Sequence, residues 1–407
     1  MANNNNKDKC NVPHLRFPEF SGEWEMSSIG EQFELYSGNT PSRMNKNQFD
    51  GSINWITSGE LKEHYISDTK EKISEEAAKN NSLKLLPVGT FVIAIYGLEA
   101  NGVRGTCSIT TRESTISQAC MAFTSKMDIQ NEFLYSWYKK HGNIIGIKYA
   151  QGTKQQNLSY DIIERFNISY PCMEEQKKLI RFISLIDQRI ATQNKIIEDL
   201  KKLKSAISKH LFARKDLLET TICLSNIATL KNGYAFQSGK YNALGKWKIL
   251  TITNVPGERY INDEDCNCII NLPNDIQDHQ VLKEGDILIS LTGNVGRVSL
   301  CKNGDYLLNQ RVGLLQLSKN VNREFLYQIL SSQRFENSMI ACGQGAAQMN
   351  IGKGDVESYV LPYSSNGNNI LWVAKILHSY DERIINELRR LTLLTMQKQY
   401  LLTQMFI

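Results

Sequence analysis

The sequence of 407 residues contains no long apolar run and only 8 prolines. Its longest apolar stretches, such as residues 91–95, fall far short of the roughly 20 residues that a membrane-spanning helix needs. The first nine residues lack the apolar segment of a signal peptide. These absences exclude a protein with membrane-spanning helices and predict a soluble protein of the cytoplasm.

Cysteine and histidine are scattered along the chain. The 9 cysteines include one close pair, Cys266 and Cys268, and no second pair that would complete a tetrahedral zinc site. The 6 histidines are dispersed and suggest neither a metal site nor a catalytic triad. We therefore expect free, reduced thiols, no metal and no cofactor.

Motifs of enzymes that modify DNA are missing as well. An amino-methyltransferase needs an Asn/Asp-Pro-Pro-aromatic motif, and the sequence has no Pro-Pro pair. Gly352-Lys-Gly354 fails the phosphate-loop pattern, because glycine follows the lysine and no glycine stands five residues earlier. Gly293-Asn-Val-Gly296 is too short for a dinucleotide-binding fingerprint. We expect a protein that is not an enzyme.

The composition that remains is that of an ordinary globular protein. Hydrophobic residues make up 41% and charged residues 22%, which excludes collagen-like and wholly disordered chains. The length predicts two or three domains. The formal net charge of +5 is compatible with a nucleic-acid partner but does not by itself indicate one.

The chain contains an internal repeat with a period of about 193 residues. Four segments return in the same order at nearly constant spacing: residues 86–97 as 282–293, 133–135 as 325–327, 152–158 as 345–351, and 186–190 as 380–384. Such agreement indicates a tandem duplication.

Each repeat has two parts of different character. A mixed part with short β-rich runs and turns precedes a long segment, from about residue 173 to 214 and from 368 to 406, that lacks proline and glycine and predicts one helix. We expect an α+β fold, in which a mixed α/β domain followed by a long helix is duplicated in tandem. The expected bounds are 1–172 and 215–364 for the mixed domains, and 173–214 and 365–407 for the helices.

The two expected helices carry matching heptad seams, which favour an antiparallel coiled coil between them. Each seam is apolar except at the same two places, Gln193 and Lys204 in the first helix and Glu387 and Lys398 in the second. A register that places Lys204 opposite Glu387 and Gln193 opposite Lys398 would pair these polar groups. Registers shifted by seven residues remain open.

Several segments resemble the specificity subunits of Type I restriction–modification systems. Pro13-His-Leu-Arg-Phe-Pro-Glu-Phe-Ser-Gly-Glu-Trp24 is similar to the opening of many such subunits, and Gly285-Asp-Ile-Leu-Ile289, Gln348-Met-Asn-Ile351 and Leu401-Leu-Thr-Gln-Met-Phe-Ile407 also look like that family. The resemblance covers essentially the whole chain from about residue 12.

The resemblance implies a function and a set of partners. In that family each mixed domain is a target recognition domain that reads one part of a split, asymmetric sequence in double-stranded DNA. The long helices act as a ruler between the parts and as docking surfaces. The implied protein partners are two methyltransferase subunits and the motor-nuclease subunits that complete the restriction complex, with no membrane involved.

Candidate DNA contacts lie in glycine-containing turns and in polar segments that follow strand-like runs. Arginine suits guanine, Asn or Gln suits adenine, and lysine suits phosphate. The candidates are Thr57, Ser58, Glu60, Arg104, Lys154, Gln155, Gln156 and Asn157 in the first half, and Asn294, Arg297, Gln310, Arg311, Gln348, Asn350 and Lys353 in the second. We expect Lys154, Gln155 and Gln156 to read bases, whereas Asn157 and Asn350, identical in both halves, suit turn structure or phosphate.

Two alternative functions remain open from the sequence. One is a stand-alone scaffold that binds only protein through its coiled coil. The other, less favoured, is a DNA-modifying enzyme in its own right. DNA affinity would separate the scaffold from the DNA-binding protein, and methylation by the purified chain alone would identify the enzyme.

Overall fold

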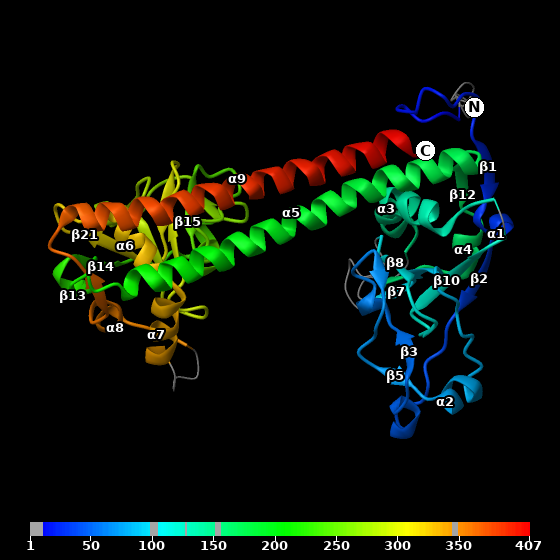
Figure 1. Ribbon diagram of the computed structural model, residues 1–407, viewed down its shortest axis with the longest axis horizontal. Helices are drawn as coiled ribbons and strands as arrows, with labels where there is room; N and C mark the ends of the chain where they lie inside the picture. Colours follow the sequence, from blue (N-terminus) through cyan, green and yellow to red (C-terminus); the bar gives the residue numbers. More distant parts are fainter. Residues whose placement is uncertain (1–10, 98–104, 127, 151–155, 344–348) are drawn as a thin grey trace. The chain divides into compact units, whose positions relative to one another are not determined.

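The computed structural model describes residues 11–97, 105–126, 128–150, 156–343 and 349–407 (Figure 1). The chain divides into two compact units. Unit 1 comprises Met1–Thr192 and Leu391–Ile407, and unit 2 comprises Gln193–Arg390. Both units mix helices and strands. The long helices α5 (Met173–Ala213) and α9 (Gly367–Met405) each contribute residues to both units.

Unit 1 is built around two sheets. Its other elements are β1 (Glu25–Ser28), α1 (Ile29–Gln32), β2 (Phe33–Ser37), η1 (Lys46–Phe49), β3 (Ile53–Ile56), η2 (Ser58–Glu60), β4 (Tyr65–Ile66), β5 (Lys72–Ile73), α2 (Glu75–Asn80), β6 (Phe91–Ala94), β7 (Tyr96–Gly97), β8 (Cys107–Thr110), β9 (Ser114–Ile116), β10 (Cys120–Ser125), α3 (Asn131–Tyr149), β11 (Gln156–Asn157), α4 (Tyr160–Glu164) and β12 (Asn167–Tyr170). The sheets have the strand orders β2-β10-β6-β8-β4 and β5-β3-β9, and β1 pairs with β12 and β7 with β11.

Unit 2 repeats this plan. Its elements are β13 (Thr220–Cys223), η3 (Leu224–Asn226), β14 (Ala228–Asn232), η4 (Ser238–Lys240), β15 (Trp247–Leu250), η5 (Ile252–Asn254), β16 (Asn267–Ile269), η6 (Asp278–Gln280), β17 (Val281–Leu282), β18 (Ile287–Ser290), β19 (Val298–Leu300), β20 (Tyr306–Leu308), β21 (Val312–Leu317), α6 (Arg323–Leu330), α7 (Gln333–Gly343), α8 (Lys353–Glu357) and β22 (Val360–Tyr363). The sheets have the orders β14-β21-β18-β19 and β16-β15-β20-β17, and β13 pairs with β22.

The strand pairing shows that the duplication predicted from sequence is a duplication of fold. The order β2-β10-β6-β8 in unit 1 returns as β14-β21-β18-β19 in unit 2, and the parallel pair β3–β9 returns as β15–β20. All residues of the inner strands β6 and β18 are buried, which explains their continuous apolar runs.

One glycine in each unit allows two backbone segments to lie in close contact. A Cβ on Gly38 would lie 1.9 Å from the carbonyl oxygen of Ile116, and one on Gly233 would lie 2.2 Å from that of Asn309. No side chain fits at either position. Glycine therefore allows the backbone after β2 to contact Ile116, and the backbone after β14 to contact Asn309.

The core of unit 1 joins the sheet to three helical segments. The first turns of α3 bury Phe133 and Trp137, and Leu179 and Ile183 of α5 pack on the same core, as do the last residues of the chain. The rings of Phe133 and Phe406 lie 5.2 Å apart, and Trp137 Nε1 donates to the carbonyl oxygen of Ile407 at 3.1 Å.

The core of unit 2 follows the same plan with the roles of the long helices exchanged. Here Phe325, Leu326 and Ile329 of α6 pack in one core with the sheet and the first part of α9, where Val373 and Leu377 are fully buried. Leu211 near the end of α5 packs on the same core.

The predicted coiled-coil seam is present, but the proposed register is wrong. The four polar residues predicted in the seam, Gln193, Lys204, Glu387 and Lys398, are buried or half-buried, and the two helices run antiparallel within each unit. However, Gln193 Nε2 donates to the Glu387 carboxylate at 2.7 Å, so neither Lys204–Glu387 nor Gln193–Lys398 is a pair. Lys204 instead binds Asp381, and Lys398 binds Asp187, each at 2.5 Å.

In the observed register, an aspartate beside the seam, rather than the seam glutamate, binds each seam lysine. In unit 2, Asp381 is held by Arg259 at 3.0 Å and by Gln328 at 2.6 Å, both from the mixed domain. In unit 1 the counterpart Asp187 lies 3.9 Å from His64, which in turn contacts Glu132 at 2.9 Å. These clusters fasten each mixed domain to the helix pair.

In the part of the chain that the structure describes, no helix is both long enough and apolar enough to cross a membrane.

Candidate nucleic-acid interface

Three segments of unit 1 meet at the end of the buried strand β6. The amide of Ile95 donates to the carbonyl of Ala119 at 2.9 Å, and the carbonyl of Ile95 accepts from the amide of Leu158 at 2.8 Å. The amide of Ser117 donates to the carbonyl of Ile56 at the end of β3. These bonds place the segment after β3, the β9–β10 connection and β11 around one strand end.

Unit 2 builds the same backbone frame around Leu291, at the end of β18. The amide of Leu291 donates to the carbonyl of Arg311 at 3.0 Å, and its carbonyl accepts from the amide of Ile351 at 2.9 Å. The amide of Asn309 donates to the carbonyl of Leu250 at the end of β15. Each bond has its counterpart in unit 1, so the two frames are equivalent.

The frame presents polar side chains at the same positions in both units. Gln118 and Asn157 are exposed on either side of Ile95, and Gln310 and Asn350 are exposed on either side of Leu291. We call this surface the polar edge. It comprises residues 57–60, 96–97, 118–119 and 156–157 in unit 1, and residues 251–254, 292–294, 310–311 and 350 in unit 2.

A capped turn forms one part of the polar edge in each unit. In unit 1, the Glu60 carboxylate accepts from the amide and hydroxyl of Thr57 and from the amide of Lys70. In unit 2, Asn254 accepts in the same way from Thr251. Thr57 and Glu60, predicted as DNA contacts, thus hydrogen-bond to each other within the turn. Ser58, also predicted, lies half-buried between them.

The turns also lie against the strand end. The turn η2 contacts β7 in unit 1, and Ile252 of η5 lies 3.4 Å from the Cβ position of Gly293 in unit 2. Gly293 has a φ of +69°, which a side chain would strain, so glycine allows the backbone to turn here.

The polar edge also carries side chains that differ between the units. Arg311 is exposed in unit 2 where unit 1 has Ala119, and Asn294 is exposed in the turn after β18. Tyr234 lies beside Gln310, whose amide donates to the Tyr234 carbonyl at 3.0 Å. The hydroxyl of Tyr234 donates to Asp275, and this carboxylate raises the pKa of Tyr234.

Two predicted contacts lie outside the polar edge. Arg297 Nε is 3.5 Å from the Glu336 carboxylate, and its side chain packs against Gly257, so it faces α7. Lys353 begins α8, and its Nζ lies 3.7 Å from the carboxylate of Glu357 one turn later. Both are about half exposed.

Four predicted contacts, Arg104, Lys154, Gln155 and Gln348, lie outside the described residues. Gln156 is described by its backbone, which pairs with Gly97 in β7, while Asn157 pairs with Tyr96.

Sequence reasoning missed Gln118, Thr251 and Asn254. Gln118 stands 192 residues before Gln310, the offset that relates the two Phe-Leu-Tyr segments. Thr251 stands 194 residues after Thr57, the offset of the helix repeat. Extending the repeat alignment between its matching segments would have found Gln118, and extending it before the first segment would have found Thr251 and Asn254.

Among the residues whose placement is described, no group of His, Cys, Asp and Glu side chains is arranged to hold a metal ion. The cysteines of this part of the chain are free thiols.

Comparison with known proteins places the chain in one family. The model of the Type I restriction modification DNA specificity domain matches twice, over residues 21–202 and 219–394. The MjaVIII specificity subunit of Methanocaldococcus jannaschii is 25% identical over 350 residues, which are 80% of this chain and 78% of that protein. The EcoR124I/EcoR124II specificity subunit of Escherichia coli is 27% identical over 208 residues, half of each chain.

Solved structures agree in fold. The S subunit of a Type I restriction–modification system from M. genitalium superposes with a TM-score of 0.56 at 16% identity, covering 97% of this chain and 99% of that one. A chain from a structure on complex assembly and conformational transition of the type I R-M system gives 0.59 at 15% identity, covering 96% and 98%. These likenesses confirm the predicted α+β fold with tandem domains.

Proposed function

The chain belongs to the family of Type I restriction–modification specificity subunits, and from that premise we propose that it reads a split, asymmetric sequence in double-stranded DNA. The observation that carries the proposal is the polar edge, which the fold builds twice on equivalent backbone frames with partly different side chains. Two similar edges that differ in side chains suit two half-sites of different sequence.

We divide the contacts by whether the two units share them. Gln118 with Gln310, and Asn157 with Asn350, are identical and equivalent, so they suit the phosphate backbone that every half-site offers. Lys353 is a further phosphate contact in this proposal. We propose that residues at which the units differ read base edges: Arg311 and Asn294 in unit 2, and Lys154 and Gln156 in unit 1.

We propose that the methyltransferase and motor-nuclease subunits of the complex supply the chemistry, while this chain directs them. Exposed apolar side chains on the long helices support a docking role: Leu185, Ile196, Leu203, Leu393, Met396 and Tyr400 are each more than 40% exposed. The helices would also set the number of bases between the half-sites.

A mobility-shift assay with the purified chain, alone and with its co-expressed methyltransferase, tests this function. We expect DNA binding whose affinity falls steeply as salt increases, because phosphate contacts release counterions. Absence of DNA affinity in both samples would favour the protein-binding scaffold instead. Methylation of DNA by the purified chain without a partner would contradict the non-catalytic role.

Replacing Arg311 with alanine should relax specificity at one position of one half-site. A bidentate arginine–guanine contact discriminates against the wrong base by about 1–3 kcal/mol. Competition between duplexes with single-base changes, measured with the methyltransferase complex, checks this. Arg334→Ala, an exposed arginine on α7 outside the polar edge, is the matched control. Loss of affinity that is equal for all duplexes would show that Arg311 contacts only phosphate.

Gln118→Ala and Gln310→Ala should weaken DNA binding to a similar degree without changing the sequence that is methylated. Each variant loses one hydrogen bond to a charged phosphate oxygen, which contributes about 1.5–3 kcal/mol. Affinity for a duplex with the target and the set of methylated sites are the two readouts. A changed base preference in either half would show that these glutamines read bases.

A further inference from the structure

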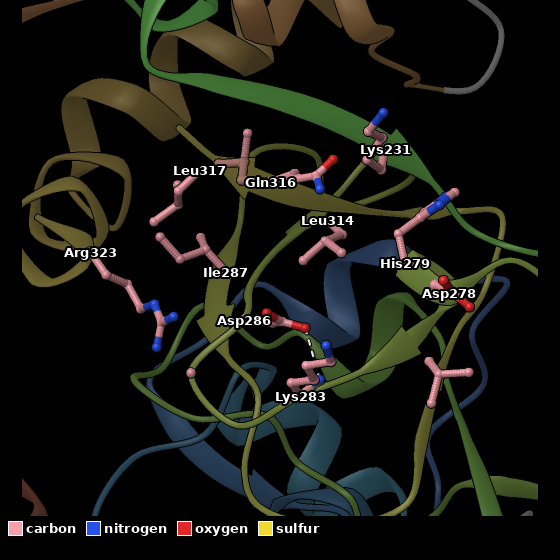
Figure 2. A pocket seen from close by; sticks show the side chains of 13 residues that line it. Lys231, Asp278, His279, Lys283, Asp286, Ile287, Leu314, Gln316, Leu317 and Arg323 are labelled. Carbon is pink, nitrogen blue, oxygen red and sulfur yellow. Dashed lines mark hydrogen bonds between the residues drawn. The ribbon is translucent and has the colours of Figure 1, made fainter. Parts of the chain in front are cut away.

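Unit 2 contains a hollow of about 600 Å³ that lies away from the polar edge. Figure 2 shows its lining: Arg323 lies on one side, Lys231 and His279 on the other, with Lys283 and Asp286 between them. The strand β18 begins at the hollow with Ile287 and ends with Ser290, next to the polar edge. The two surfaces therefore lie at opposite ends of this strand.

Three basic side chains of the hollow form no ion pair with the described residues. Among the described residues, no carboxylate lies within ion-pair distance of Lys231, Lys283 or Arg323. Lys248 and Lys302 elsewhere in unit 2, by contrast, both bind Asp263 at 2.9 Å.

Two carboxylates also line the hollow, Asp278 near His279 and Asp286 between the cations, and neither forms an ion pair with Lys231, Lys283 or Arg323. Asp286 accepts a hydrogen bond from the backbone amide of Lys283 at 2.8 Å. Burial raises the pKa of its carboxyl group, while the charges of Arg323 and Lys283 act in the opposite direction. Three basic against two acidic side chains leave an excess of positive charge at the hollow, which favours an anion there.

Unit 1 shows that the fold does not require these charges. By strand register, Lys231 corresponds to Tyr36, because their partners Leu314 and Ala122 occupy equivalent places in β21 and β10. By the sequence repeat, Lys283 corresponds to Pro87 and Arg323 to Asn131.

These neutral counterparts make hydrogen bonds within unit 1. Asn131 donates to the carbonyl of Gly89 at 2.8 Å, and the Tyr36 hydroxyl accepts from the amide of Lys84 at 2.9 Å. The same fold thus forms in unit 1 with uncharged residues where unit 2 has cations.

The glycine at position 285 leaves room for the guanidinium group of Arg323. Gly285 has a φ of +83°, and a Cβ there would lie 2.3 Å from Nη1 of Arg323. The guanidinium can rest on this turn because residue 285 has no side chain. Its planar set of donors suits two oxygens of one phosphate, and lysine adds a mobile point charge.

We propose that this hollow is a phosphate-binding site specific to unit 2, which takes a phosphate group of a free nucleotide or of the DNA backbone. Its volume exceeds that of a single phosphate and falls in the usual range of small-molecule sites. The apolar side chains of Ile287 and Leu314, which also line it, provide surface for the remainder of such a ligand. The site stands independently of the proposed reading of bases, because the polar edge does not contribute to it.

Calorimetric titration of the full-length chain with inorganic phosphate and with ATP, at ionic strength held constant with NaCl, tests the site. We expect saturable binding of at least one of these probes, weakened about tenfold or more in Arg323→Ala and in Lys283→Ala. Arg334→Ala, which removes the same charge outside the hollow, should bind as the unchanged protein does. Circular dichroism of each variant checks that it is folded.

A second arm distinguishes the two sources of phosphate. If the site takes the DNA backbone, Arg323→Ala lowers the slope of log affinity against log salt by about 1 for a duplex without any target sequence. If it takes a free nucleotide, this slope is unchanged while ATP still binds. The proposal is overturned if the folded variants keep full phosphate and ATP binding, or if the unchanged protein binds neither probe and Arg323→Ala leaves the DNA salt slope unaltered. The methylated sequence would still be split and asymmetric in that case, so the proposed function would stand.

Discussion

Asp381→Ala is expected to destabilise unit 2 by about 3–5 kcal/mol, the cost of breaking a buried ion pair by removing one partner. Asp381 is 8% exposed and accepts from Lys204, Arg259 and Gln328. The Arg259 side chain is equally buried, so the substitution leaves it with Glu324 as its remaining carboxylate. The loss of Asp381 also removes its contacts from the long helix α9 to Arg259 and Gln328 of the mixed domain.

Unfolding by urea, followed by circular dichroism, measures this effect. The internal counterpart Asp187→Ala provides a matched comparison, because Asp187 and Lys398 are 27% and 22% exposed and water can replace the lost contacts. We expect about 1–2 kcal/mol for Asp187→Ala. Equal and small effects of the two substitutions would show that the cluster around Asp381 does not hold unit 2 together.

Phe406→Ala is expected to destabilise unit 1 by about 3–5 kcal/mol, as for other fully buried aromatic residues. Phe406 is 2% exposed, and its ring packs on Phe133 within the core that α3 and the sheet share. The truncation leaves a cavity and also loosens the bond from Trp137 to the neighbouring Ile407 carbonyl.

Thermal and urea unfolding of the full chain measure this loss. Tyr400→Ala is the control on the same helix, since Tyr400 is 60% exposed and its removal should change stability by less than about 0.5 kcal/mol. An unaltered unfolding free energy for Phe406→Ala would contradict the packing of the end of α9 into unit 1.

The repeat and the long helices could be predicted from sequence because both leave periodic patterns. Segments 86–97 and 282–293 repeat the central strand with the turn that follows it, and the heptads of α5 and α9 mark the faces that are buried. The register could not be predicted, because it depends on Asp187 and Asp381, which lie outside the seam. Their partners His64 and Arg259 come from distant parts of the sequence.

The candidate site was predictable in part. Asn157, Asn350, Gln310 and Arg311 fall on the polar edge because glycine-containing turns and strand ends mark surface loops. The sequence did not reveal that the Glu60 carboxylate accepts hydrogen bonds from Thr57 and Lys70. A polar side chain that stabilises a turn cannot be distinguished in sequence from one that contacts a ligand. Gln118 was missed because its neighbours differ from those of Gln310.

Methylation-site sequencing of cells that express this chain with its methyltransferase partner is the most direct test of the central proposal. Two equivalent but non-identical polar edges predict one methylated motif in two separated parts of different sequence, and the family resemblance implies that adenine is the modified base in each part. Substitution of unit 2 residues such as Arg311 should change only one of the two parts of the methylated motif. A contiguous or palindromic motif would contradict the account.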